Sequence, residues 1–184
     1  MEYIKGSDFR LHNTVVTLGK FDGLHLGHKE LIDIVLKTKG LTKVLFTFDV
    51  NPLSILSNKE FKVIETGTER INLMKDSGFD YMIDYPFTME TINTNADEFI
   101  KTIIHDKLGA KMLVVGTDFR FGKDRLGDVE LLEKRSKEYG YVLKVIEKKK
   151  MYGEIISSTR IRSLIKKGEI RLANELLGRE FSFS

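Results

Sequence analysis

The segment from Thr17 to His28 places a glycine-rich turn between an apolar strand and an amphipathic helix. The β-branched run at 14–18 is typical of a buried strand, and residues 27–37 carry apolar side chains at helical spacing. A strand, a tight turn and a helix start leave backbone N–H groups free to bind an anion. The pattern therefore predicts an α/β fold with a phosphate site in this turn.

Two histidines, His25 and His28, lie in the same turn. If the helix begins near Leu26, both imidazoles can face a phosphate held at its N-terminus. A zinc site is one alternative, but zinc needs a third ligand, and His12 and His105 are far from the pair in sequence. Packing of the turn is the other alternative, and the glycines around the pair argue against it.

Apolar runs alternate with helical stretches along the rest of the chain. We expect further strands at 44–48, 81–85, 112–116 and 141–146, and helices at 69–75, 95–107 and 128–139. Runs such as 112–115 are apolar throughout, as in strands that helices cover on both faces of a parallel sheet. The order predicts a doubly wound, mostly parallel sheet, whose ligands lie beyond the carboxyl ends of the strands.

The composition narrows the class of protein. A chain of 184 residues with 41% hydrophobic and 31% charged residues fits one globular domain over 1–184, without a membrane span. The absence of cysteine and of an apolar leader favours a cytoplasmic protein. The net charge is +3, and the lysines at 148–150 lack interleaved aromatic residues. We expect small-molecule substrates and no nucleic acid, and no protein partner is evident.

An aromatic pair, Phe119 and Phe121, follows the predicted strand 112–116 in a loop bracketed by glycines. Two such side chains either pack into the core or form a stacking surface for a planar ligand. For these two residues taken alone, the sequence favours core packing.

Residues 156–162 have the pattern of a helix N-terminus, with hydroxyl residues as caps before an amphipathic helix. Three successive hydroxyl residues precede two arginines in the first turn, where the helix dipole disfavours cations. A bound anion would explain the combination, and Arg162 could clamp a polyphosphate through two hydrogen bonds.

Two motifs resemble the signatures of the HxGH nucleotidyltransferase superfamily. They are Gly19-x-Phe21-Asp22-Gly23-x-His25-x-Gly27-His28 and Ser157-Ser158-Thr159-x-x-Arg162. Together with Thr47-Phe48-Asp49, the loop 116–122 and the closing segment 173–179, they resemble the adenylyltransferase module of the bacterial bifunctional riboflavin kinase/FAD synthetase family. The motifs span residues 15–181.

The resemblance implies a Rossmann-like fold with C-terminal helices. It implies transfer of AMP from ATP to FMN with Mg²⁺, giving FAD and pyrophosphate by in-line attack without a covalent intermediate; the metal ligands stay unknown. The implied catalytic residues are His25, His28 and Arg162. The implied ATP contacts are Gly19, Phe21, Asp22, Gly23, Ser158 and Thr159, and the implied flavin contacts are Phe48, Asn51, Asp118 and Phe121.

The sequence departs from the family pattern at Val50, Asn51, Leu56 and Ile155. Two alternatives therefore stay open: an HxGH nucleotidyltransferase with another phosphorylated acceptor, and a non-catalytic flavin-nucleotide binding protein. We also expect that residues 1–184 contain no riboflavin kinase domain, because too few residues follow the last motif for a second catalytic domain.

Overall fold

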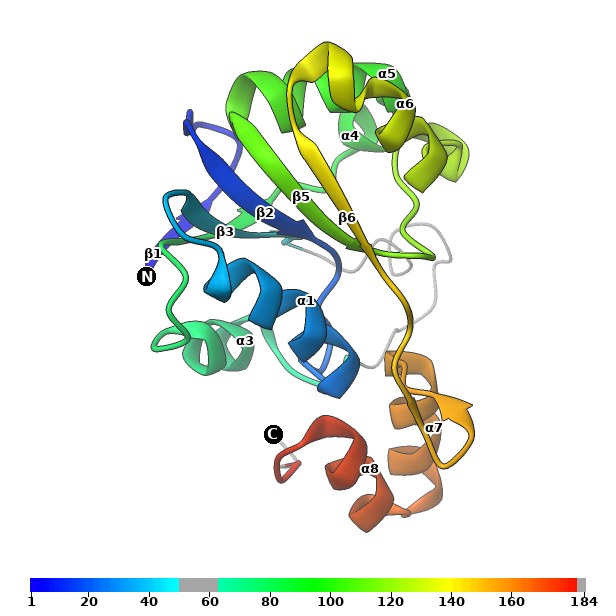
Figure 1. The fold of residues 1–184 in the computed structure, drawn as a ribbon. Helices are drawn as coiled ribbons and strands as arrows, with labels where there is room; N and C mark the ends of the chain where they lie inside the picture. The colour runs from blue at the N-terminus through cyan, green and yellow to red at the C-terminus, as the bar shows by residue number, and fades with distance from the viewer. Residues whose placement is uncertain (50–62, 182–184) are drawn as a thin grey trace.

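The computed structural model describes residues 1–49 and 63–181, which form a six-stranded sheet with helices on both faces (Figure 1). The strands of this sheet are β1 (Glu2–Lys5), β2 (Thr14–Leu18), β3 (Thr42–Phe48), β4 (Tyr81–Tyr85), β5 (Ala110–Gly116) and β6 (Val142–Ile146). They all pair in parallel, in the order β1-β4-β3-β2-β5-β6. The helices that connect these strands are α1 (Leu26–Lys37), α3 (Gly67–Met74), α4 (Met89–Asn93), α5 (Ala96–Phe99), the π-helix η1 (Ile100–Lys107), the 3₁₀ helix η2 (Lys123–Arg125) and α6 (Val129–Tyr139).

Each face of the sheet has its own apolar core. Alternate residues of β2 point to opposite faces, so Val16 packs with η1 and α6, whereas Val15 packs with α1 and α3. All five residues of β2 are buried, as expected for a central strand covered on both sides. The predicted doubly wound α/β fold is therefore confirmed.

The carboxyl end of β2 is the point where the strand order reverses. From β2 the chain continues to β3 and β4 on one side, and it then crosses to β5 on the other side of β2. Loops diverge at such a switch point and leave room for a ligand beyond the strand ends. The turn after β2 begins at this place.

A separate C-terminal part lies beyond this edge of the sheet (Figure 1). It consists of the hairpin β7 (Lys150–Met151) and β8 (Glu154–Ile155), followed by α7 (Ser158–Lys167) and α8 (Ile170–Leu177). Buried apolar residues of α7 and α8 form a third core with Ile64 and the half-buried Leu26 at the start of α1. The C-terminal helices are thus packed against the N-terminus of α1.

Most predicted elements agree with the structure to within two residues, and the strands 14–18 and 81–85 agree at both ends. The predicted helix 95–107 is instead divided into α5 and η1. The short elements β1, α4, η2, β7 and β8 were not predicted, because elements of two to five residues have too little periodicity to recognise. None of the helices within 1–49 and 63–181 is long and apolar enough to cross a membrane.

Candidate functional site

The turn after β2 is held in an unusual backbone conformation. Phe21 and Leu24 have φ values of 47° and 39°, a region that costs a residue other than glycine about 1–2 kcal/mol. Phe21 offsets this cost because its ring is completely buried in the core beneath α1. Gly23 has φ of 87°, and a Cβ there would lie 2.8 Å from Ile64 Cδ1. Burial and close packing therefore fix the turn in place.

His25 and His28 stack on each other at the start of α1. His25 is the N-cap, and its Nδ1 accepts a hydrogen bond of 3.3 Å from the backbone N–H of His28. The ring centroids are 3.7 Å apart and the ring planes differ by 12°. Because Nδ1 of His25 is an acceptor, the neutral ring carries its proton on Nε2. That N–H remains as a hydrogen-bond donor to a ligand.

Both histidines are neutral at pH 7. Burial lowers the pKa of His25 to about 4. Burial, together with the neighbouring His25, lowers the pKa of His28 well below its ordinary value. Nδ1 of His28 is buried and has no hydrogen-bond partner among the described residues. The pair can therefore stabilise an anion through neutral N–H groups at a helix N-terminus.

The N-terminus of α7 is joined directly to this turn. The Ser158 hydroxyl donates a hydrogen bond of 2.8 Å to the backbone oxygen of Asp22. The Asp22 carboxylate accepts from Ile64 N–H at 2.8 Å through Oδ1 and pairs through Oδ2 with Arg162. Thr159 Oγ1 accepts from Arg162 Nη2 at 3.4 Å. The fold thus brings together the two motifs that the sequence separates.

The two arginines in the first turn of α7 both have carboxylate partners in the protein, so their presence there does not by itself indicate a bound anion. Arg160 pairs with Glu154 at 2.9 Å, and Arg162 pairs with Asp22. Arg162, predicted as catalytic, therefore holds the turn against α7 in this structure. Asp22, predicted to bind ATP, has both carboxylate oxygens in protein contacts.

A second ionic contact ties the end of α8 to the same turn, and the sequence analysis did not identify it. Arg179 Nη2 donates to the backbone oxygen of Gly23 at 2.9 Å and to Glu65 Oε2 at 2.6 Å. Burial raises the pKa of Glu65 to about 7, although Arg179 opposes this rise. The motif 173–179 includes Arg179, but nothing in the sequence indicates its partner Glu65.

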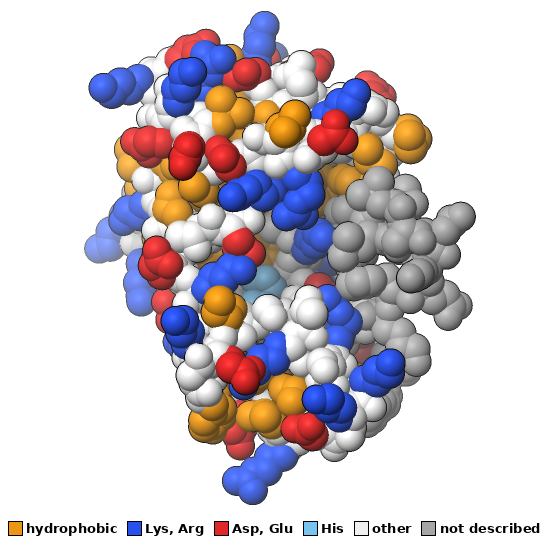
Figure 2. Space-filling view, turned by 90° about the vertical axis from the view of Figure 1, so that its right-hand side faces the viewer, with side chains coloured by type: hydrophobic (Ala, Val, Ile, Leu, Met, Phe, Trp, Pro, Cys, Tyr) orange, Lys and Arg blue, Asp and Glu red, His pale blue; other side chains and the backbone are white. Residues whose placement is uncertain are grey.

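Two further cations near the turn were also missed. Burial lowers the pKa of Lys20, and the nearby positive charges of Arg125 and Arg162 lower it further. Figure 2 shows a hollow with a histidine at its floor and lysine and arginine side chains around it. A lysine inside the glycine-rich turn was the available signal for Lys20. The position of Arg125 depends on how its loop folds.

Two of the predicted flavin residues, Phe48 and Phe121, pack with the core on the opposite face of the sheet from Phe21. Phe48 is half-buried and has its ring centroid 5.1 Å from that of Phe87. Phe121 is 7% exposed and packs against Phe99 and Phe119. The core packing that the sequence favoured for Phe119 and Phe121 is therefore confirmed for Phe121.

Asp118, Ile155 and Gly19 each have different surroundings in the structure. Asp118 pairs with Lys148 at 2.6 Å. Asn51, together with the departures Val50 and Leu56, lies outside the described residues. Ile155 is 40% exposed on β8. Gly19 continues the sheet beyond β2, since its N–H donates to Phe46 O at 3.1 Å.

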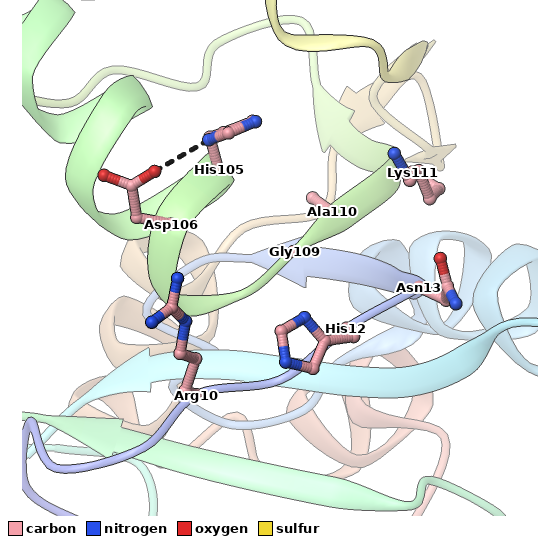
Figure 3. A pocket seen from close by; sticks show the side chains of 8 residues that line it. All are labelled: Arg10, His12, Asn13, His105, Asp106, Gly109, Ala110 and Lys111. Carbon is pink, nitrogen blue, oxygen red and sulfur yellow. Dashed lines mark hydrogen bonds and ion pairs between the residues drawn. The ribbon is translucent and has the colours of Figure 1, made fainter.

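A different hollow of about 450 Å³ lies at the amino ends of β2 and β5 (Figure 3). Its lining includes Arg10, His12 and Lys111, which are exposed, and a pair between His105 and Asp106 at 2.8 Å. It contains none of the predicted site residues. The candidate site is therefore the hollow at the carboxyl edge.

Comparison with known proteins shows the family of this chain. The model of the family described as FAD synthetase matches residues 8–160. A protein of Buchnera aphidicola subsp. Schizaphis graminum named bifunctional riboflavin kinase/FMN adenylyltransferase is 35% identical over 94% of this chain and 57% of its own length. A protein of the same name from Escherichia coli K12 is 32% identical over 92% of this chain and 56% of its own length. A Listeria monocytogenes protein named FAD synthetase is 30% identical over 89% of this chain and 68% of its own length.

Solved structures that are similar to this chain share its fold. A crystal structure named macrolide-efflux protein from Streptococcus pneumoniae has a TM-score of 0.84 and 28% identity, covering 98% of this chain and 63% of that one. A pantoate-beta-alanine ligase from Francisella tularensis, with a TM-score of 0.56 and 15% identity over 90% of this chain and 70% of its own, shares the fold alone. The chain spans only 57% of the length of the Buchnera relative. Because the family model covers most of its residues, the chain belongs to the FAD synthetase family.

Proposed function

We propose that this chain transfers AMP from ATP to FMN, which forms FAD and pyrophosphate. The observation that carries the proposal is the stacked pair of neutral histidines at the N-terminus of α1, tied through Asp22 to the N-terminus of α7. Relatives named FMN adenylyltransferase or FAD synthetase support the choice of substrates.

In the proposed reaction, a phosphate oxygen of FMN attacks the α-phosphorus of ATP in line with the leaving group. The new P–O bond forms as the bond from the α-phosphorus to the oxygen bridging to the β-phosphorus breaks, and its electron pair leaves with pyrophosphate. The attacking phosphate is already ionised near pH 7, so no general base is required. This agrees with the lowered pKa values of both histidines.

The histidines then act as donors to developing charge. Nε2–H of His25 is left for a phosphate oxygen because Nδ1 is occupied by the backbone of His28. A neutral donor held by ring stacking and helix geometry needs no reorganisation as charge builds up on the α-phosphate. Ser158 and Thr159 place the first turn of α7 beside the same anion.

The proposed reaction uses Mg²⁺ together with the phosphates of ATP. Within 1–49 and 63–181 no three histidine, aspartate or glutamate side chains are grouped as metal ligands. Mg²⁺ is commonly held by substrate phosphates and water with little protein ligation, and it would neutralise their charge. We therefore treat Mg²⁺ as entering with ATP, and no step proposed here depends on a protein ligand to it.

A second candidate is AMP transfer to a different phosphorylated acceptor. Two observations favour it: Phe121 is packed in the core, and Asp118 is paired with Lys148. Both residues were predicted to contact the flavin. The acceptor is therefore less well supported than the transfer of a nucleotide.

The test measures pyrophosphate release and FAD in parallel, with purified protein, ATP, Mg²⁺ and FMN. NMN, phosphopantetheine and glycerol 3-phosphate serve as other acceptors, each with ATP and with CTP. Formation of FAD supports the proposal. Release of pyrophosphate with another acceptor alone would select the second candidate, and tight binding of FMN and ATP without release would indicate a binding protein.

A further inference from the structure

Three positively charged side chains lie near one another at the hollow beyond β2. Lys20 is close enough to both Arg125 and Arg162 for their charges to lower its pKa. The three come from different segments: the turn after β2, the loop before α6, and α7. Figure 2 shows lysine and arginine side chains on the walls of this hollow.

The backbone of Lys20 is fixed by hydrogen bonds to its carbonyl oxygen. Its carbonyl oxygen accepts from Thr47 Oγ1 at 3.2 Å and from Arg70 Nη1 at 3.4 Å. The preceding Gly19 is bonded to β3. Lys20 is half-buried, so its position is determined by the end of the sheet.

Arg125 is held in a small closed loop. Phe121 and Gly127 exchange two backbone hydrogen bonds, of 3.0 and 2.9 Å, and close the loop between them. Inside it, Asp124 and Arg125 have φ values of 54° and 59°. Two consecutive left-handed residues other than glycine cost about 1–2 kcal/mol each, and such strain is concentrated at functional sites. The closed loop maintains this conformation and presents an exposed guanidinium.

The local carboxylate does not neutralise these cations. Asp22 is the acid near Lys20, and its two oxygens are used by Ile64 N–H and Arg162. Within the residues that the structure describes, no salt bridge joins Lys20 or Arg125 to a carboxylate. A nearby polyphosphate would remove the repulsion between them and form charge-assisted hydrogen bonds.

We propose that Lys20 and Arg125 hold the β- and γ-phosphates of ATP and then the pyrophosphate that leaves. The inference rests on the proposed AMP transfer and adds two residues to its leaving-group site. When the bond to the α-phosphorus breaks, pyrophosphate gains the electron pair and becomes more negative. Contacts to it therefore strengthen in the transition state, so their loss lowers kcat as well as ATP affinity.

The test is calorimetric binding of inorganic pyrophosphate to Lys20→Met and Arg125→Met, without FMN and therefore without turnover. Lys111→Met and Arg10→Met are matched controls, because both residues are exposed at the opposite edge of the sheet. We expect each site variant to bind pyrophosphate about tenfold more weakly, as for loss of a charge-assisted contact. AMP binding and the controls should stay within about twofold of wild type. Lys20→Arg should restore pyrophosphate binding.

The outcomes separate this inference from the proposed function. Pyrophosphate affinity equal to wild type in both methionine variants would overturn the inference, and so would a wild-type protein that binds no pyrophosphate. Weaker binding in the variants combined with no FAD from wild type would support the phosphate site and refute the proposed function. Should Lys20→Met fail to fold, Arg125→Met decides alone, because its side chain is exposed.

Discussion

The Arg162 guanidinium on α7 forms an ion pair with the carboxylate of Asp22, 140 positions earlier in the chain. The pair joins the two motifs that are predicted to bind phosphate. It also places the first turn of α7 against the turn after β2, where Ser158 bonds to the backbone of Asp22. The geometry of the site therefore depends on a contact between N-terminal and C-terminal segments.

Asp22→Asn should weaken both folding and ATP binding. Asparagine keeps an oxygen for Ile64 N–H but removes the charge that Arg162 faces, so we expect a loss of about 1–3 kcal/mol in the free energy of unfolding. Urea denaturation and the KM for ATP measure the two effects. Asp76→Asn is the control because Asp76 is exposed. The double variant Asp22→Asn/Arg162→Gln tests whether the two side chains are coupled. If it loses as much free energy of unfolding as the two single variants added together, the coupling is contradicted.

Substitution of the histidines should lower the rate far more than the stability. His25→Asn retains a side-chain acceptor for capping α1 but removes the ring N–H, and we expect FAD formation to fall by about 100-fold or more. His28→Gln should behave similarly. Initial rates and thermal melting are measured together, with His12→Gln as the control at the opposite edge. A rate within about twofold of wild type in His25→Asn would count against a catalytic role.

His25 should stay neutral through the physiological range in the free protein. Its pKa lies at about 4 because the ring is buried, so its NMR resonances should not move between about pH 8 and about pH 5.5. The spectrum of His25→Asn assigns the signals. Binding of a non-hydrolysable ATP analogue should raise this pKa, since an anion stabilises the charged ring. A midpoint near 6.5 without ligand would show that the ring is solvated.

Glu65 should make stability depend on pH. Its folded pKa of about 7 exceeds its ordinary value of 4.5, so folding favours the protonated form. This contribution is fully present below pH 4.5 and is lost as the pH rises through 7. The free energy of unfolding of wild type relative to Glu65→Gln should fall on the order of 3 kcal/mol over that interval.

Denaturation curves at several pH values provide this comparison, and taking the difference from Glu65→Gln cancels the opposite contribution of His25. The exposed Glu130→Gln should show no such dependence. A difference between wild type and Glu65→Gln that rises with pH would mean that the pair with Arg179 outweighs the burial of the carboxylate.

Phe121→Ala should act mainly through stability. The ring is buried against Phe99, and removal of a buried phenylalanine costs about 3–5 kcal/mol. Met89→Ala, at a position 68% exposed, is the control and should change the free energy of unfolding by less than about 1 kcal/mol. If Phe121→Ala instead left stability unchanged and weakened FMN binding alone, the ring would belong to the flavin site.

The sequence determined the elements whose signal is local. The β-branched run of β2, the glycine-rich turn and the helical spacing of α1 are readable because strand and helix periodicities are properties of neighbouring residues. The hydroxyl run likewise predicted a capped helix start, and Ser157 is the N-cap of α7 in the structure. The motifs further predict His25 and His28 as site residues, and the structure brings the two rings together at the start of α1.

The tertiary structure decided which charged side chains contact one another. The pairs of Asp22 with Arg162 and of Glu65 with Arg179 join segments far apart in sequence, and no local pattern specifies such partners. The proximity of Lys20 and Arg125 likewise arises only when the loop before α6 folds beside the end of β2. Periodicity reports which face of an element is buried, whereas the packing of separate elements sets ion pairs, lowered pKa values and the shape of the site.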